Sequence, residues 1–281
     1  MNSLHLPPLQ RALSMIFVAA LVIAALFISQ AEAKMNIQQV TSPGGIKAWL
    51  VESRQVPLIA MKFGFEGGAV QDPEGKEGLA NFVSGMLDEG AGDMSSTQFQ
   101  ERQEELAVKM QFETGRDVFI GTFQTLTRNR DEAAKLLRLA LTEPTFSKDA
   151  VERIKGQILT SLKFDENDPR NVASKEWFQL AFKGHPYARP VKGSPESVSA
   201  ITAKDLKQFS RNVFARDALK IGVVGDIDAE TLGPMLDAIF GDLPEKSGVK
   251  PVAEAAPPAG PLQKVIEMNV PQSVAVFGHS G

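Results

Sequence analysis

Side chains able to bind a metal or attack a substrate are scarce in this sequence. After residue 33 the histidines are His185 and His279, and the chain contains no cysteine. A catalytic zinc ion normally takes three protein ligands, so a site built here would be mostly carboxylate, which suits magnesium or calcium better. The serines at positions 84 and 161 lie in neither a G-x-S-x-G elbow nor an S-x-x-K pair. We interpret both as space-filling residues.

Two further polar groups have structural interpretations. His185 begins the tripeptide His185-Pro186-Tyr187, which we interpret as a turn that packs Tyr187 against helices, because no suitable nucleophile accompanies the histidine. The acidic run at 165–168 lacks the spaced ligands of a calcium loop, so we interpret it as a solvated helix end.

Residues 78–87 have the apolar spacing of a helix with one buried face. The apolar positions are Leu79, Phe82, Val83, Met86 and Leu87. The opposite face carries small or polar residues, namely Asn81, Ser84, Gly85 and Asp88. Because a solvated helix face usually carries long charged side chains, we expect this face to border a cavity or a neighbouring chain.

This frame resembles the zinc-binding helix of the pitrilysin/insulinase-like metallopeptidases (peptidase family M16), in which Gly-Leu-Ala leads directly into H-x-x-E-H. In that motif the two histidines bind zinc and the glutamate activates water. The corresponding positions here hold Asn81, Ser84 and Gly85. The resemblance therefore implies a member with a degenerate catalytic motif and an intact hydrophobic frame.

The resemblance also implies two glutamates on a later helix, one a zinc ligand and one supporting it. By the family's spacing these positions fall on Ser161 and, one heptad earlier, on Ile154. Residues seven apart lie on one side of a helix, so the pairing is physically sensible. Neither residue is a metal ligand. We therefore expect no catalytic residue, no metal and no cofactor in this chain, with zinc held by a partner subunit.

The similarity extends over nearly all of the chain after the N-terminal segment. Its further pieces are Asp168-Pro169 with Ala173 and Phe182, then His185-Pro186-Tyr187, residues 191–198 and residues 223–228. In the family, an antiparallel sheet covered by helices forms one unit. Two such units joined by a linker usually make a subunit, and four units enclose a peptide chamber.

Local patterns independently predict an α+β unit with an antiparallel or mixed sheet covered by helices, because strands come first, then helices, then a returning strand. The expected strands are residues 36–41, 46–52, 59–65, 110–114, 118–126 and 219–224. The expected later helices begin near residues 95, 131, 147, 171, 202 and 228.

We expect three regions after the N-terminal segment. Residues 35–243 form the peptidase-like unit, and residues 244–261 are rich in Pro, Ala and Gly and resemble a linker. Residues 262–281 are predicted to hold the first strands, 265–269 and 273–278, of a truncated second unit. Two strands do not bury a core, so we expect them to pair onto another chain or to begin that unit.

Residues 1–33 have the pattern of a signal peptide. Arg11 is followed by an apolar run over 12–29 and by Ala31-Glu32-Ala33, an A-x-A cleavage site. An uncleaved membrane anchor is the alternative, because the run is just long enough to span a bilayer. We expect export to the periplasm with cleavage. The net charge of −4 favours neither a nucleic-acid nor an anionic-membrane partner.

Together these features predict a non-catalytic, peptide-binding and chamber-forming subunit of a periplasmic zinc peptidase, paired with a catalytic homologue that keeps H-x-x-E-H. We expect strand 59–65 to be an exposed edge that binds extended peptide by β-addition. The alternatives are a structural assembly subunit without a peptidase partner, and a hydrolase with an unrecognised site.

Overall fold

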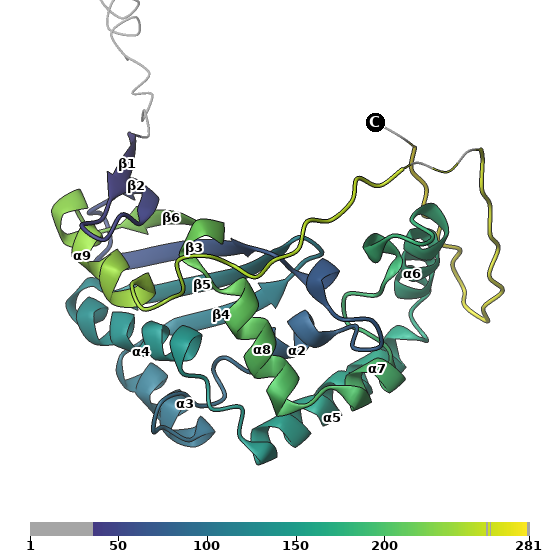
Figure 1. Ribbon diagram of the computed structural model, residues 1–281, viewed down its shortest axis with the longest axis horizontal. Helices are drawn as coiled ribbons and strands as arrows, with labels where there is room; N and C mark the ends of the chain where they lie inside the picture. Colours follow the sequence, from purple (N-terminus) through teal and green to yellow (C-terminus); the bar gives the residue numbers. More distant parts are fainter. Residues whose placement is uncertain (1–35, 257, 259, 280–281) are drawn as a thin grey trace, which may run out of the picture. The chain divides into compact units, whose positions relative to one another are not determined.

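The computed structural model describes residues 36–256, 258 and 260–279, so the expected signal peptide lies outside the described residues. Within them, six strands form one mixed sheet in the order β1-β2-β6-β3-β5-β4 (Figure 1). The strands are β1 (Ile37–Thr41), β2 (Lys47–Glu52), β3 (Leu58–Glu66), β4 (Lys109–Thr114), β5 (Val118–Leu126) and β6 (Leu219–Gly225). β2 and β6 run parallel, and the other neighbouring pairs are antiparallel. The predicted α+β class with a mixed sheet is confirmed.

Strand β3 lies inside the sheet, which contradicts the exposed edge expected for residues 59–65. It is hydrogen-bonded to β5 on one side and to β6 on the other. Alternation along β3 specifies the buried face, with Met61 and Phe63 buried and Lys62 exposed between them. It does not specify the lateral neighbours, and the returning strand β6 inserts between β2 and β3. The two edge strands are instead β1 and β4, and β4 is the one that contacts α2.

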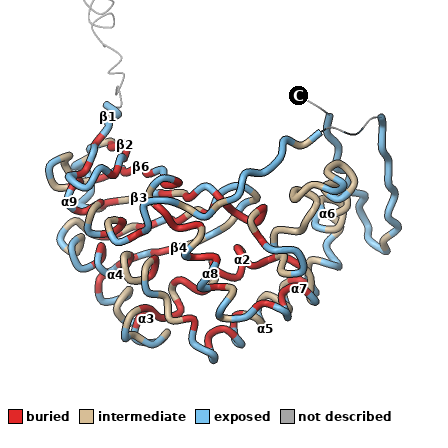
Figure 2. Tube along the Cα trace, viewed as in Figure 1, coloured by how far each residue is buried: buried red, intermediate tan, exposed pale blue. Residues whose placement is uncertain are grey.

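Helices cover one face of the sheet, and the described residues leave the other face without a helical layer (Figures 1 and 2). The helices are α2 (Leu79–Ser84), α3 (Ser96–Glu105), α4 (Arg130–Thr142), α5 (Lys148–Asp165), α6 (Pro169–Ala181), α7 (Pro195–Ala200), α8 (Ala203–Val213) and α9 (Ala229–Phe240). Short 3₁₀ turns are η1 (Ala69–Gln71), η2 (Thr127–Asn129), η3 (Pro186–Ala188) and η4 (Arg216–Ala218). No helix in the described part of the chain is both long and apolar enough to cross a membrane.

Aromatic rings fill the space between the sheet and the helices. Phe63 of β3 lies edge-on to Phe240 of α9, with ring centroids 5.2 Å apart. Gly121 of β5 is directly opposite Phe63. A Cβ atom at Gly121 would lie only 2.1 Å from Cζ of Phe63, so the missing side chain makes room for the ring.

Helix α2 is shorter than the apolar stripe predicted. It ends at Ser84, and the amides of Gly85 and Met86 donate to carbonyls three residues earlier, so the chain continues as tight turns. Met86 and Leu87 are nevertheless fully buried. The predicted buried face therefore holds although the regular helix does not extend along it.

Asp72 fixes the start of α2. Its carboxylate accepts hydrogen bonds from the amides of Gly78 at 2.8 Å and Ala80 at 2.9 Å. Arg189 donates to the carbonyl oxygens of Asp72 and Val70, at 2.8 and 2.9 Å. Burial raises the pKa of Asp72 to about 7, although the amide hydrogen bonds and Arg189 act in the opposite direction.

The segment after α9 corrects one expectation. Residues 265–269 and 273–278 form no strand, and Val265 and Phe277 are 78% and 89% exposed. A strand needs a hydrogen-bonded neighbour, and the sheet of the described residues does not extend to this segment. The predicted linker, by contrast, is attached to the main unit, because Lys250 exchanges two backbone hydrogen bonds with the side chain of Gln71.

Candidate functional site

The five positions of the degenerate motif line one groove of about 650 Å³. They come from two segments: Asn81, Ser84 and Gly85 from α2 and its end, and Ile154 and Ser161 from α5. The groove is completed by Asp88 and Glu89, by Gln157 and Ile158, and by Met110, Gln111, Phe112, Glu113 and Thr122 of β4 and β5. The structure therefore brings together the residues that the resemblance assigned to the metal site.

The pairing of α2 with α5 follows from the apolar stripe of α5. Ser147 caps α5 by accepting the amide of Ala150, and the buried Val151 and Ile154 turn that side of the helix inward. A Cβ atom at Gly85 would lie 3.4 Å from Cγ2 of Ile154, so the two segments touch there. Ser161, seven residues after Ile154, reaches the same groove.

The five motif positions offer little to a cation. The Ser84 hydroxyl donates to the carbonyl oxygen of Asn81 at 2.8 Å, so it is engaged within its own helix. The five motif positions carry neither imidazole nor carboxylate. Over the described residues, no group of three or more His, Cys, Asp or Glu side chains is placed to hold a metal ion. The surviving shape lacks the donor set of a catalytic zinc site.

An ion pair at one end of the groove was not anticipated from the sequence. Glu89 follows the tight turns after α2, and Arg153 of α5 donates to it from Nη1 at 3.1 Å and from Nη2. The Ser96 hydroxyl also donates to Glu89. Burial opposes ionisation of Glu89, but these hydrogen bonds outweigh it and lower the pKa. Residues 64 positions apart carry no local signal of such a pairing.

Asp88 lies where the groove adjoins a second cavity of about 540 Å³ along β4. Burial raises the pKa of Asp88, and the neighbouring charge of Glu89 adds to the effect. Gln111 and Thr122 also line both cavities. The two cavities therefore adjoin each other beside β4, which is one of the two end strands of the sheet.

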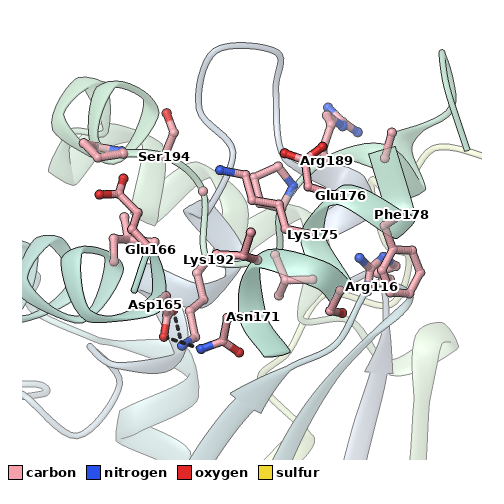
Figure 3. A pocket seen from close by; sticks show the side chains of 18 residues that line it. Arg116, Asp165, Glu166, Asn171, Lys175, Glu176, Phe178, Arg189, Lys192 and Ser194 are labelled. Carbon is pink, nitrogen blue, oxygen red and sulfur yellow. Dashed lines mark hydrogen bonds and ion pairs between the residues drawn. The ribbon is translucent and has the colours of Figure 1, made fainter. Parts of the chain in front are cut away.

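His185 and Asp165, which we interpret as structural residues, make structural contacts. Nδ1 of His185 accepts from the amide of Tyr187 at 3.1 Å, and the two rings lie 4.6 Å apart. This confirms the turn interpretation. Asp165 at the end of α5 pairs with Lys192 at 2.7 Å and accepts from Asn171 at 2.9 Å, at the side of a separate cavity of about 320 Å³ (Figure 3).

Comparisons with known proteins agree with this geometry. Residues 50–194 match the model described as Insulinase (Peptidase family M16), and residues 200–279 match the model of the Peptidase M16 inactive domain. The first match covers more than half of the chain. The fold and the groove thus define a protein of the metallopeptidase class with an altered metal site, and the chain belongs to peptidase family M16.

Individual relatives point to members without peptidase activity. The non-peptidase homolog YmxG of Helicobacter pylori is 27% identical over 81% of this chain and 52% of its own length. The peptidase M16 inactive domain from Pseudomonas fluorescens has a TM-score of 0.74 at 26% identity, over 79% of this chain and 54% of that one. Pitrilysin has a TM-score of 0.69 at 17% identity, over 80% of this chain and 25% of that one, a likeness of fold. This chain spans about half the length of the first two relatives.

Proposed function

We propose that this chain is a non-catalytic subunit of a periplasmic zinc peptidase, to which it contributes a peptide-binding part of the chamber wall. A catalytic homologue with an intact H-x-x-E-H supplies the zinc and the hydrolytic step. The observation that carries the proposal is the groove itself. All five positions of the family's metal site border it, and none of them has a side chain that holds zinc.

The position of β4 supports a role in binding peptide. As the last strand of the sheet it pairs with β5 alone among the described strands, so its outer backbone edge is available to an extended polypeptide. The groove and the second cavity run beside that edge. Peptide binding by β-addition therefore belongs to β4, and no longer to β3.

The names of relatives support the proposed partner and compartment. One relative is a mitochondrial-processing peptidase subunit beta of Saccharomyces cerevisiae, 22% identical over 66% of this chain and 39% of its own length. Another match of the fold is the periplasmic protease PqqL of Escherichia coli, at 18% identity and a TM-score of 0.69 over 80% of this chain and 26% of that one. The predicted signal peptide of residues 1–33 favours the same compartment.

A binding experiment with a matched pair of variants tests the proposal. We expect labelled unstructured peptides to bind the chain, alone or mixed with its H-x-x-E-H homologue, and to be cleaved solely in the mixture. Chelator should abolish cleavage and leave binding intact. Ser161→Trp fills the groove and should weaken binding about tenfold or more, whereas Thr160→Trp, one residue away on the exposed side of α5, should not.

A chain that binds no peptide in either form, or that cleaves peptide alone in the presence of chelator, would contradict the proposal. The second outcome would favour a hydrolase with an unrecognised site. A structural assembly role is the other candidate, because subunit 1 of the Caenorhabditis elegans cytochrome b-c1 complex is 20% identical over 88% of this chain and 56% of its own length. Stable incorporation into a larger complex without peptide binding would favour that role.

A further inference from the structure

Helix α6 is packed more loosely than the other long helices. None of its residues is buried, although it carries Trp177, Phe178 and Leu180. A cavity of about 320 Å³ is lined by α6, by the end of α5 and by residues 188–195 (Figure 3). Because few apolar contacts hold α6 against this cavity, small shifts of the helix have space to occur.

One side of α6 holds the turn between β4 and β5. The guanidinium carbon of Arg116 lies 3.3 Å from the ring centroid of Phe178, a cation–π contact visible in Figure 3. Nε of Arg116 donates to the carbonyl oxygen of Tyr187 at 3.2 Å. The Tyr187 hydroxyl donates to Asp117 at 2.9 Å. Arg116 and Asp117 are both in the turn that ends β4, so this contact set fixes one end of the edge strand.

The Trp177 side of α6 holds the C-terminal segment. Residues 262–277 and α6 together line a cavity of about 530 Å³. Lys264 forms an ion pair with Glu176, and Gly278 packs so closely that a Cβ atom there would lie 2.7 Å from Cζ2 of Trp177. The Trp177 and Phe178 rings meet edge-on with centroids 4.9 Å apart. One aromatic pair thus contacts both the C-terminal segment and the β4–β5 turn.

We propose that α6 is a positioning element for the groove. Phe178 and Arg116 hold the β4–β5 turn, and the contact of the C-terminal segment with Trp177 is transmitted through Phe178 to edge strand β4. Arg116 and Phe178 are therefore positioning residues, which act on the groove through β4. The effect on peptide affinity rests on the proposed function, whereas the effect on β4 itself does not.

Hydrogen–deuterium exchange of the full chain separates these steps. Phe178→Leu removes the aromatic face, so we expect amides of residues 109–118 to exchange roughly fivefold faster, the scale of a single cation–π contact. Phe178→Tyr keeps the aromatic ring that contacts Arg116, so its residues 109–118 should exchange as slowly as those of the wild type. Trp177→Leu should free residues 262–278, measured as faster limited proteolysis of that segment because its amides are largely without backbone hydrogen bonds to the described residues, and should also accelerate exchange in residues 109–118. Phe164→Leu, at an exposed ring at the end of α5, is the matched control and should leave residues 109–118 unchanged.

Each other outcome overturns a defined part of the inference. Unchanged exchange in residues 109–118 of Phe178→Leu would remove the positioning role, and equal acceleration in α9 would show a general loss of stability instead. If Trp177→Leu frees the C-terminal segment and leaves β4 unchanged, the coupling is absent. Peptide binding is measured in parallel: equal affinity of wild type and Phe178→Leu overturns the link to the groove, whereas no binding by wild type contradicts the proposed function alone.

Discussion

At the scale of single residues, the groove differs from a zinc site by a few side chains on a retained backbone. Gly85 has φ −86°, a conformation that any residue can adopt, so the backbone does not require glycine at this position. Asn81 and Ser84 are half-buried and face the groove, where larger side chains would have space to extend. The residues at these positions therefore remove metal-binding side chains without requiring a different backbone.

Restoring the family's residues should create a zinc site. We expect the variant N81H/S84E/G85H/S161E to bind one zinc ion per chain, measured by titration calorimetry and metal analysis, because it supplies two imidazoles and a carboxylate. Since the new side chain at position 85 points toward Ile154, adding Ile154→Ala should raise the affinity further. Omitting Ser161→Glu should weaken binding. A folded variant without zinc affinity would contradict the pairing of α2 with α5.

The buried carboxyl of Asp72 should make stability depend on pH. Its pKa is about 7 in the folded chain against an ordinary value of 3.8, so the folded state binds more protons between those values. Stability therefore falls as pH rises from about 4 to about 7, by up to about 1.4 kcal/mol per pH unit from this group. Above pH 7 this contribution is constant.

Urea unfolding of wild type and Asp72→Asn at several pH values between 4.5 and 7.5 measures this contribution. The difference in free energy of unfolding between the two proteins should shift in favour of Asp72→Asn as pH rises. The carboxamide of the variant does not titrate, so the contributions of all other groups cancel in the comparison. A pH-independent difference would show that the amides of Gly78 and Ala80 keep Asp72 ionised throughout.

At the scale of elements, glycine occupies a position in β5 and a position in β6 under different packing constraints. Gly121 lies opposite Phe63 on the covered face, where any side chain meets the ring. Gly222 of β6 lies opposite Lys62 on the uncovered face, and a Cβ atom there would come no closer than 4.0 Å to the Lys62 carbonyl oxygen. The same residue type is thus a packing requirement in β5 and a tolerant position in β6.

This difference predicts a contrast in stability. Gly121→Ala should destabilise the chain by about 1–3 kcal/mol through overpacking, whereas Gly222→Ala should be near neutral. Phe63→Leu should recover part of the loss when combined with Gly121→Ala, because it removes the ring that the new methyl group meets. Thermal or urea unfolding checks all four proteins. Equal effects of the two alanine variants would contradict the packing account.

At the scale of the whole unit, the sheet face without a helical layer borders directly on the groove. Gln111 and Thr122 are opposite each other on β4 and β5, on the face that carries no helical layer, and both line the groove. The same face exposes Trp49 and Val224, at 51% and 49%. A polypeptide bound along β4 would therefore lie at the border between the groove and an open sheet surface.

Much of this architecture was predictable from local patterns. Local patterns identified the six strands of the sheet but also predicted strands at 265–269 and 273–278 that do not form. The spacing at residues 79–87 identified the buried face that ends at Leu87. Ser147 marked the start of α5, whereas α6 begins at Pro169 behind the Asp168 cap, two residues before the start expected near residue 171. The identities at Asn81, Ser84, Gly85, Ile154 and Ser161 were enough to predict the loss of metal ligands, because ligand chemistry is a property of the residue type.

The tertiary structure decided what depends on distant partners. Insertion of β6 placed β3 inside the sheet, whose two edge strands are β1 and β4, since a period of two specifies a strand's faces and says nothing about its neighbours. The Glu89–Arg153 ion pair and the attachment of α6 through Arg116 arise between residues far apart in the chain. The sequence alone therefore determined which side chains stand at the motif positions, and the packing of long-range neighbours decided which strands form the edges of the sheet.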